Sequence, residues 1–188
     1  EDETYKSDYT IIVSKSNEST QREIVNTHSM ISNRVAGLIV SIAQGTDRSG
    51  HFQAVKDHHI PLVFLDRVLE EMDVSRVVAD DFNGAVNATS HLVEAGHRRI
   101  AHIAGPAHLS VGRDRLKGFR HALKMHGIFC PEEYIVHCGM SEEDGIRGVR
   151  QLHRLAERPD AVFAVNDPVA IGIYMELKSL GMRIPDDM

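Results

Sequence analysis

Three short apolar runs in this sequence end in a polar side chain that can bind hydroxyl groups. Asp66 ends "PLVFLD", Ser41 ends "GLIVS" and Asn166 ends "AVFAVN". Such runs, rich in Val and Ile and not alternating with polar residues, are typical of strands buried on both faces, so each polar group is expected at the carboxyl end of a strand. A carboxylate accepts hydrogen bonds from sugar or ribose hydroxyls, and an amide can donate and accept at once. The pattern therefore predicts a binding site for a ligand that carries hydroxyl groups.

These residues also have simpler structural explanations. Asp66 can cap a turn or pair with Arg67, and the Ser41 hydroxyl can stabilise a turn. Asp167 stands directly after Asn166 and before a proline, which predicts that Asp167 is the N-cap of the next helix. The sequence leaves both kinds of explanation open for Asp66 and Ser41.

Two arginines follow the loop at residues 105–112, in the stretch "AGPAHLSVGRDRLKGF". Arg113 and Arg115 lie two apart at the start of an expected helix, so they point to different sides, and one can face a ligand while the other faces solvent. A guanidinium offers five donors in a fixed fork, which suits paired hydroxyls, a carboxylate or a phosphate. The alternative is that both arginines form surface ion pairs with Asp114 or other acidic groups. Phe163, three residues before the polar end of its run, either walls a pocket or belongs to the core.

The sequence contains none of the motifs that would predict catalysis or metal binding. Its twelve histidines show no HExxH motif and no Cys–His ligand spacing, and His121 and His126 are five apart, which does not place two ligands on one helix face. No GxSxG, Walker or GxGxxG motif is present. Ser110, near His108 and Arg113, has no evident partner that would orient it as a nucleophile. We therefore expect no enzyme, no metal site and no cofactor.

The composition favours a soluble globular protein without a membrane span. Of 188 residues, 42% are hydrophobic and 26% are charged, and apolar runs such as "YTIIV" are much shorter than a membrane-spanning helix. The net charge of −6 and a pI near 6.0 argue against a general basic face for nucleic acid. Cys130 and Cys138 can form a disulfide, but we favour two free thiols in a reducing cytoplasm.

The apolar runs alternate with segments of helix length, which predicts an α/β fold with parallel sheets and right-handed crossovers. Thr20 to Glu23 ("TQRE") can form a capping box at a helix start, and Gly96, Gly127 and Gly181 each stand where a glycine ends a helix. Strands are expected at residues 9–13, 37–42, 61–65, 76–79, 99–104, 134–137 and 161–165.

One interval breaks this alternation and predicts a boundary between two domains. Only "DRVLEEMDVSR" separates Leu65 from Val77, which is too short for the crossover helix that consecutive parallel strands need. We expect the strand that follows to leave the first sheet as a connector, and a second sheet to begin after a helix at residues 83–95. An N-terminal lobe then spans residues 1–79 and a C-terminal lobe residues 80–188, with the ligand in the cleft between them, outside the carboxyl ends of the strands.

The chain contains, in order and over nearly its whole length, the stretches "RVAGLIVS", "HIPLVFLDR", "VVADDFNGAVNATSHLVEAGHRRIAHIAGP", "RDRLKGF", "AVFAVNDPVAIG" and "LGMRIPDD". Together they resemble the effector-binding core of the LacI (lactose-repressor) family of bacterial transcription regulators. The resemblance implies a type I periplasmic-binding-protein fold with two Rossmann-like lobes. It also implies an incomplete fragment: the N-terminal lobe lacks its first strand, the C-terminal lobe lacks its last strands, and a helix-turn-helix domain precedes residue 1.

The resemblance also implies roles for particular residues. Arg115 matches the effector-contacting arginine of the family's "RxRLxGF" pattern, and Asn166 matches a ligand-contacting asparagine. Combined with the strand-end pattern, this predicts a set of effector contacts: Ser41, Asp66, Arg115, Phe163 and Asn166.

The function that the resemblance implies is the ligand-sensing and dimerisation core of a cytoplasmic, DNA-binding transcriptional regulator. A small-molecule effector between the lobes controls operator binding, and the operator is contacted through the domain outside this chain. A homodimer and no membrane partner are expected. The alternative is a secreted sugar-binding protein of a transporter, which shares the fold. Because the chain has no Trp to stack on a sugar ring, the effector classes left open are a sugar, a sugar phosphate and a nucleoside or purine.

Overall fold

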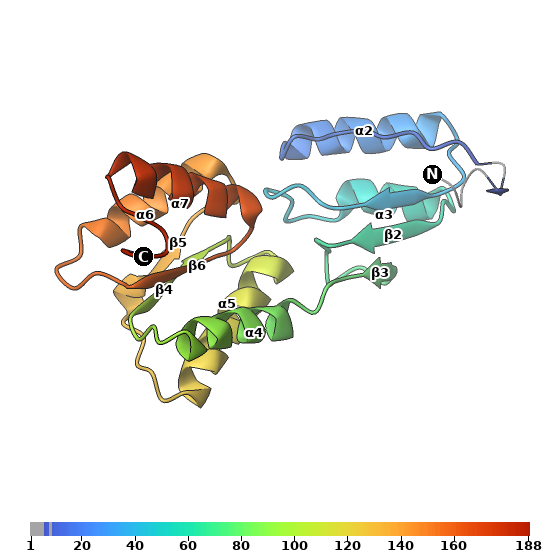
Figure 1. Cartoon of the computed structure of the whole chain (residues 1–188). Coiled ribbons are helices and arrows are strands. Elements are labelled where there is room, and N and C mark those ends of the chain that lie inside the picture. Colours follow the sequence, from blue (N-terminus) through green and yellow to red (C-terminus); the bar gives the residue numbers. More distant parts are fainter. Residues whose placement is uncertain (1–5, 8) are drawn as a thin grey trace. The chain divides into compact units, whose positions relative to one another are not determined.

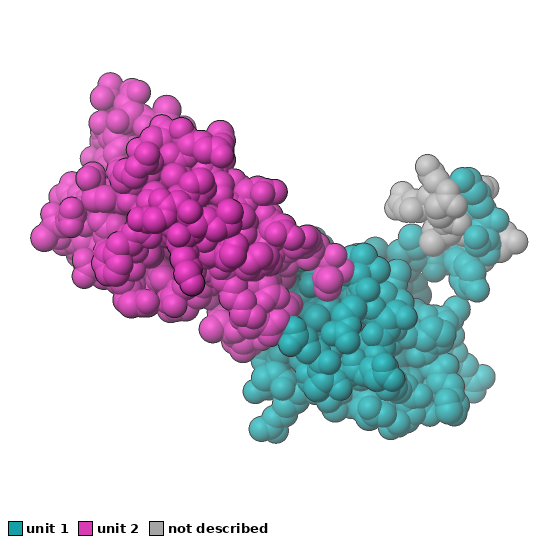
Figure 2. Space-filling model, turned by 90° about the horizontal axis from the view of Figure 1, so that it is seen from below, with its two compact units in different colours: residues 1–77 teal, residues 78–188 magenta. Residues whose placement is uncertain are grey.

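The structure, a computed structural model, describes residues 6–7 and 9–188. The chain divides into two units, coloured separately in Figure 2: unit 1 comprises residues 1–77 and unit 2 residues 78–188. The boundary predicted from the sequence, between residues 79 and 80, lies two residues further along. The assignment of the units as the two lobes of an effector-binding core stays a prediction.

Unit 1 is built on a three-stranded parallel sheet in the order β1-β2-β3. Leu38 of β1 pairs with Leu62 of β2, and Leu65 of β2 pairs with Val77 of β3. The strands expected at residues 37–42 and 61–65 are confirmed in shorter form. In chain order the elements, labelled in Figure 1, are α2 (Thr20–Ser32), β1 (Leu38–Val40), α3 (Gly50–Asp57), β2 (Leu62–Leu65) and β3 (Ser75–Val77).

The prediction that the strand near Arg76–Ala79 leaves the first sheet is wrong, because β3 is the third strand of that sheet. Residues 66–74 connect β2 to β3 in parallel without a helix. Three apolar side chains of this connection are buried, Val68, Leu69 and Met72. The connection therefore buries apolar surface as a crossover helix would, and a short loop suffices.

The strand predicted at residues 9–13 is wrong as well. The structure assigns no strand to this segment, and its apolar side chains are exposed, with Val13 at 79%. In the described part of unit 1 the sheet consists of β1, β2 and β3, so the segment has no hydrogen-bonded neighbour. An apolar run becomes a strand only where a neighbour satisfies its backbone groups.

The predicted capping box from Thr20 to Glu23 is wrong, because α2 begins differently. Its N-cap is Ser19, whose hydroxyl accepts a hydrogen bond from the backbone N–H of Arg22 at 3.3 Å. The side chain of Glu23 is not available to complete a capping box, since it is buried within unit 1.

The Glu23 carboxylate instead holds the segment that follows β1. It accepts hydrogen bonds from the Ala43 backbone N–H at 2.5 Å and the Thr46 hydroxyl at 2.6 Å, and it lies 3.0 Å from Nε2 of His51. Burial by itself would raise the pKa of Glu23, but its bonds to His51, Thr46 and Ala43 outweigh burial and lower that pKa. The carboxylate therefore stays ionised and ties α2 to the β1–α3 loop.

Unit 2 contains a second parallel sheet, in the order β5-β4-β6. Ile100 of β4 pairs with Ala161 of β6, and Ala104 of β4 pairs with His137 of β5. The three strands expected in this half of the chain are confirmed. In chain order the elements are α4 (Asp81–Glu94), β4 (Ile100–Ala104), α5 (Ser110–Met125), the 3-10 helix η1 (Glu132–Tyr134), β5 (Ile135–His137), α6 (Glu142–His153), β6 (Ala161–Ala164) and α7 (Asp167–Ser179).

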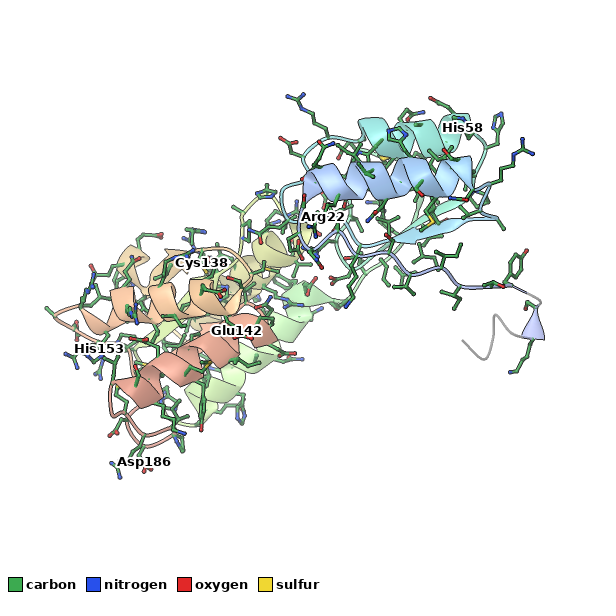
Figure 3. All side chains as sticks on the ribbon, turned by 90° about the horizontal axis from the view of Figure 1, so that it is seen from above. Arg22, His58, Cys138, Glu142, His153 and Asp186 are labelled. Carbon is green, nitrogen blue, oxygen red and sulfur yellow. The ribbon has the colours of Figure 1, made fainter. Side chains whose placement is uncertain are left out.

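Helices cover both faces of this sheet. α4 and α5 pack on one face and α6 and α7 on the other (Figure 1). All five residues of β4 are buried. Figure 3 shows α6 and α7 side by side, with Glu142 at the start and His153 at the end of α6. Gly118 of α5 lies against the carbonyl of Phe82 in α4, where no side chain would fit, so these two helices approach closely.

The predicted helix-ending glycines are confirmed. Gly96, Gly127 and Gly181 follow α4, α5 and α7, and their φ angles are 102°, 66° and 75°. These left-handed values favour glycine, which has no Cβ to clash with the carbonyl oxygen.

Candidate functional site

A groove of about 750 Å³ lies along unit 2, lined by α4 and the edge strand β6. Its apolar lining comes from alanines of α4 and from residues 162–165, and its polar groups include Asp81. Three of the five predicted effector contacts line it, namely Arg115, Phe163 and Asn166. All residues that line this groove belong to unit 2.

Arg115 projects from α5, and two groups hold its guanidinium. Nε donates to an Asp81 carboxylate oxygen at 2.8 Å, Nη2 lies 2.7 Å from the same oxygen, and Nη1 donates to the Val165 carbonyl. These contacts leave N–H groups of the five-donor fork for a ligand, and the side chain is 26% exposed. The expected pairing with Asp114 applies to Arg113, whose Nε donates to that carboxylate at 3.0 Å.

Asn166 caps α7, so the prediction that Asp167 is the N-cap is wrong. The backbone of Asn166 is extended, its Oδ1 accepts from the Val169 N–H at 3.0 Å, and α7 begins at Asp167. Its Nδ2 donates to the Met140 carbonyl at 3.1 Å. Asn166 thus joins the loop after β5 to the start of α7, and its amide keeps one N–H and one lone pair for a ligand.

Phe163 is both a wall of the groove and a part of the core, the two alternatives that the sequence left open. It lines the groove, and it also packs against the buried cluster beneath α4 and α5. Its ring stacks on that of His102, with the ring centres 4.7 Å apart and an interplanar angle of 21°. Nδ1 of His102 donates to the Phe163 carbonyl at 2.8 Å.

Two further residues near this groove, His102 and Met140, were not predicted from the sequence. His102 is fully buried, and burial lowers its pKa to about 4. The available signal was a histidine inside an apolar run, "IAHIA". Met140 had no such signal: its sulfur packs against Gly105, where a Cβ would lie 2.8 Å away, and this contact joins the loops after β4 and β5.

Ser41 and Asp66, the other predicted contacts, lie in unit 1 directly after β1 and β2, and both are exposed. The backbone N–H of Asp66 donates to the Val77 carbonyl at 2.9 Å. Arg67 does not pair with Asp66; its guanidinium donates to the Glu18 carboxylate at 2.8 Å and 2.9 Å. Both predicted contacts therefore follow adjacent parallel strands, and their roles toward a ligand stay predictions.

The two cysteines are free thiols and are half-buried. Burial raises the pKa of Cys130 and of Cys138 to about 11, so both stay protonated at neutral pH and are poor nucleophiles. Cys138 lies in the loop before α6 (Figure 3). Within residues 6–7 and 9–188, no three His, Cys, Asp or Glu side chains are grouped to hold a metal ion. In the same ranges, no helix has the length and apolar character of a membrane span.

Residues 89–188, more than half of the chain, match the periplasmic binding protein-like domain. The chain belongs to this family. The predicted α/β fold of periplasmic-binding-protein type, with parallel sheets, is therefore confirmed.

Relatives and a solved structure agree with this periplasmic binding protein-like assignment. The chain is 32% identical over 185 residues to the HTH-type transcriptional repressor PurR of Klebsiella pneumoniae, covering 98% of this chain and 54% of that protein. It is 29% identical over 183 residues to the ribose operon repressor of Haemophilus influenzae, with 97% and 54% covered. A crystal structure of a LacI transcriptional regulator from Bacillus cereus subsp. cytotoxis matches with a TM-score of 0.85 and 27% identity, over 98% of this chain and 65% of that one.

These similarities confirm the resemblance to LacI-family regulators. Both curated relatives are transcriptional repressors. The periplasmic binding protein-like chain spans about half the length of the curated relatives it matches.

Proposed function

We propose that this chain is the ligand-sensing and dimerisation core of a DNA-binding transcriptional regulator. A small-molecule effector contacts the groove of unit 2 and changes operator binding through a DNA-binding domain outside residues 1–188. It can do so only if its affinity differs between two states of the protein. The proposal rests on one observation above all: Arg115, Phe163 and Asn166 line one groove in a chain whose relatives are repressors.

The groove chemistry supports an effector that carries hydroxyl groups, as a sugar, a sugar phosphate or a nucleoside does. The fixed guanidinium of Arg115 can donate to paired hydroxyls or a phosphate, and the Asn166 amide can donate and accept. Phe163 offers an apolar surface for one face of a ring. The groove volume lies within the range of small-molecule sites, which runs from about 300 to 1,000 Å³.

The Arg115–Asp81 ion pair suggests how an effector shifts the two states. Asp81 is the first residue of α4, three residues after Val78, where unit 2 begins. An effector that takes up donors of Arg115 changes the strength of this ion pair, and so acts on the start of α4. We infer that Ser41 and Asp66 of unit 1 add further hydroxyl contacts.

The remaining parts of the proposal concern the whole protein. We infer that it is a cytoplasmic homodimer that binds operator DNA, and that it catalyses no reaction. The absence of catalytic motifs from the sequence and the repressor relatives support this inference.

Calorimetric titration of the chain with D-ribose, ribose 5-phosphate and adenosine tests the ligand role. We expect one of them to bind, and Arg115→Ala to weaken that binding at least about tenfold, the effect of losing one charge-assisted hydrogen bond. Arg113→Ala is the matched control, because Arg113 lies on the same helix and does not line the groove. Unchanged affinity in Arg115→Ala contradicts the role of Arg115.

The native gene upstream of Glu1 tests the regulatory role. A helix-turn-helix segment there, together with operator release by the same ligand, supports the proposal. A signal peptide in its place supports the secreted sugar-binding protein instead.

A further inference from the structure

A buried imidazole lies behind the groove wall. His102 is in the middle of β4, is 0% exposed, and its Cα pairs with that of Phe163 in the neighbouring strand. Since a carbonyl oxygen can only accept, the 2.8 Å contact to the Phe163 carbonyl requires the His102 proton on Nδ1. The imidazole also stacks on Phe163, and it contacts Phe119 in the same cluster, with ring centres 5.1 Å apart. His102 thus holds Phe163 by both backbone and ring.

The surroundings of the other imidazole nitrogen, Nε2, oppose protonation of His102. Nε2 of His102 is buried and has no hydrogen-bond partner in the described part of the chain. The charged or titratable groups that act on it are Arg115 from α5 and His137 from β5, and both oppose a positive charge. Burial is the main cause that lowers the His102 pKa to about 4; the hydrogen bond to the Phe163 carbonyl acts in the other direction and is outweighed. A protonated imidazole here would be an unpaired charge in an apolar site.

Side chains from two other elements hold the strand that carries Phe163. His102 of β4 donates a hydrogen bond to the carbonyl of residue 163, and Arg115 of α5 donates one to the carbonyl of residue 165. β6 has one strand neighbour in the described sheet, β4, so these side chains add support along an edge strand. Phe163 and Asn166 at the groove depend on the position of this strand.

We propose that His102 is a positioning residue of the groove: its neutral imidazole fixes the ring and backbone of Phe163, and protonation, which would bury a charge, displaces the imidazole and so releases them. The inference rests on the proposed function in one respect only, that the groove holds the effector. His102 touches no ligand in this proposal and acts through Phe163.

An acid titration of the wild-type chain followed by NMR tests this coupling without any ligand. The probes are the ring signals of Phe163, assigned by their loss in Phe163→Leu, and the Cε1–H signal of His102. We expect both signals to stay constant from pH 7.5 to about 5.5 and then to change together at lower pH. An ordinary histidine, with a pKa near 6.5, would already change within the first range. Phe163 signals that do not follow His102 overturn the proposal.

Two substitutions at pH 7.5 give a readout that acid unfolding cannot disturb. His102→Gln retains an N–H donor for the Phe163 carbonyl and should keep the Phe163 signals near those of the wild type, without the acid response. His102→Leu retains bulk but no donor and should shift them. His137→Gln, on the exposed neighbouring histidine, should leave the Phe163 signals at pH 7.5 like those of the wild type. Wild-type Phe163 signals in a folded His102→Leu protein overturn the proposal.

Titration with D-ribose separates this inference from the proposed function. If D-ribose binds the wild type, His102→Leu should weaken binding about tenfold and His102→Gln less than about threefold. Equal affinity in both variants contradicts the positioning role. If D-ribose does not bind the wild type, ribose is rejected as the effector, and the Phe163 signals alone decide the role of His102.

Discussion

Units 1 and 2 both contain a three-stranded parallel sheet, but they bury it to different extents. In unit 2, helices cover both faces and every residue of the central strand β4 is buried. In unit 1, one face of the sheet is exposed, with Ile39, Leu65 and Val77 as much as 74% accessible. Strands of similar apolar composition are thus buried to different extents in the two units. The composition of a strand alone does not determine how far it is buried.

The units also hold the loops at the carboxyl ends of their strands by different means. In unit 1, buried or bridging carboxylates do so: Glu23 binds the Ala43 N–H, and Glu18 binds Gln44 and Arg67. In unit 2, the Asn166 cap and close packing beneath the groove hold them. We therefore expect unit 1 to respond most to the loss of polar contacts and unit 2 to the loss of packing.

The largest expected effect is the loss of a ring from the unit 2 core. Phe119→Ala should lower the free energy of unfolding by about 3–5 kcal/mol, because Phe119 is fully buried and the site can close only in part. Ile39→Ser, on the exposed face of unit 1, should change it by less than about 0.5 kcal/mol. Urea unfolding followed by circular dichroism measures both values.

A comparable loss for the two variants would contradict the comparison. It would mean that the exposed face around Ile39 is covered in solution, and that the two sheets are buried alike.

The same difference explains which parts of the fold could be predicted. The strands and glycine helix ends of unit 2 follow from local patterns, because a fully buried parallel sheet gives unbroken apolar runs and Gly127 needs a left-handed backbone. In unit 1 the same reasoning failed at residues 9–13, where an apolar run has no neighbour, and at residues 66–74, where a loop replaces a helix. Pairing between distant segments decided both cases.

The candidate site divides in a similar way. Arg115, Phe163 and Asn166 were predictable as a group because strand ends and the following helix start meet at one edge of a sheet. The partner of Arg115 could not be predicted, because Asp81 lies 34 residues earlier and no local pattern links the two residues. The cap of α7 was assigned to Asp167 because both Asn and Asp suit that position, and only the backbone geometry at Asn166 distinguishes them.

Acid should destabilise the two units in different pH windows. The His102 pKa falls from an ordinary 6.5 to about 4 on folding, so the unfolded chain binds the proton more tightly and stability falls as pH drops below 6.5. The loss approaches about 3 kcal/mol near pH 4. The Glu23 pKa is lowered on folding, so its contribution is present above 4.5 and is lost only at lower pH.

Urea unfolding at pH 7.5, 5.5 and 4.5 checks this order. His102→Gln should lose less stability than the wild type between pH 7.5 and 4.5, whereas Glu23→Gln should lose the same amount as the wild type over that range. If the free energy of unfolding of His102→Gln falls with pH as steeply as that of the wild type, His102 does not cause the acid sensitivity.

A somewhat smaller effect is expected for the buried carboxylate of unit 1. Glu23→Ala should cost about 2 kcal/mol at pH 7.5, because it leaves the Ala43 N–H buried without an acceptor and the Thr46 hydroxyl with only the long contact to the Thr20 hydroxyl, at 3.4 Å. Glu18→Ala is the matched control, since Glu18 contacts the same loop from an exposed position and should cost less. Equal costs would show that burial of the carboxylate does not matter.

The smallest predicted effect concerns the start of α7. Asn166→Ala should cost about 1 kcal/mol, the usual value of a lost N-cap, because the Val169 N–H loses its acceptor. Asp167→Ala should cost less, since Asp167 is exposed and is already within the helix. The same two variants also test the role of Asn166 in the groove. If Asn166→Ala weakens ligand binding more than its effect on stability explains, Asn166 contacts the ligand as well as capping α7. Equal stability of the two variants would contradict the assignment of the cap to Asn166.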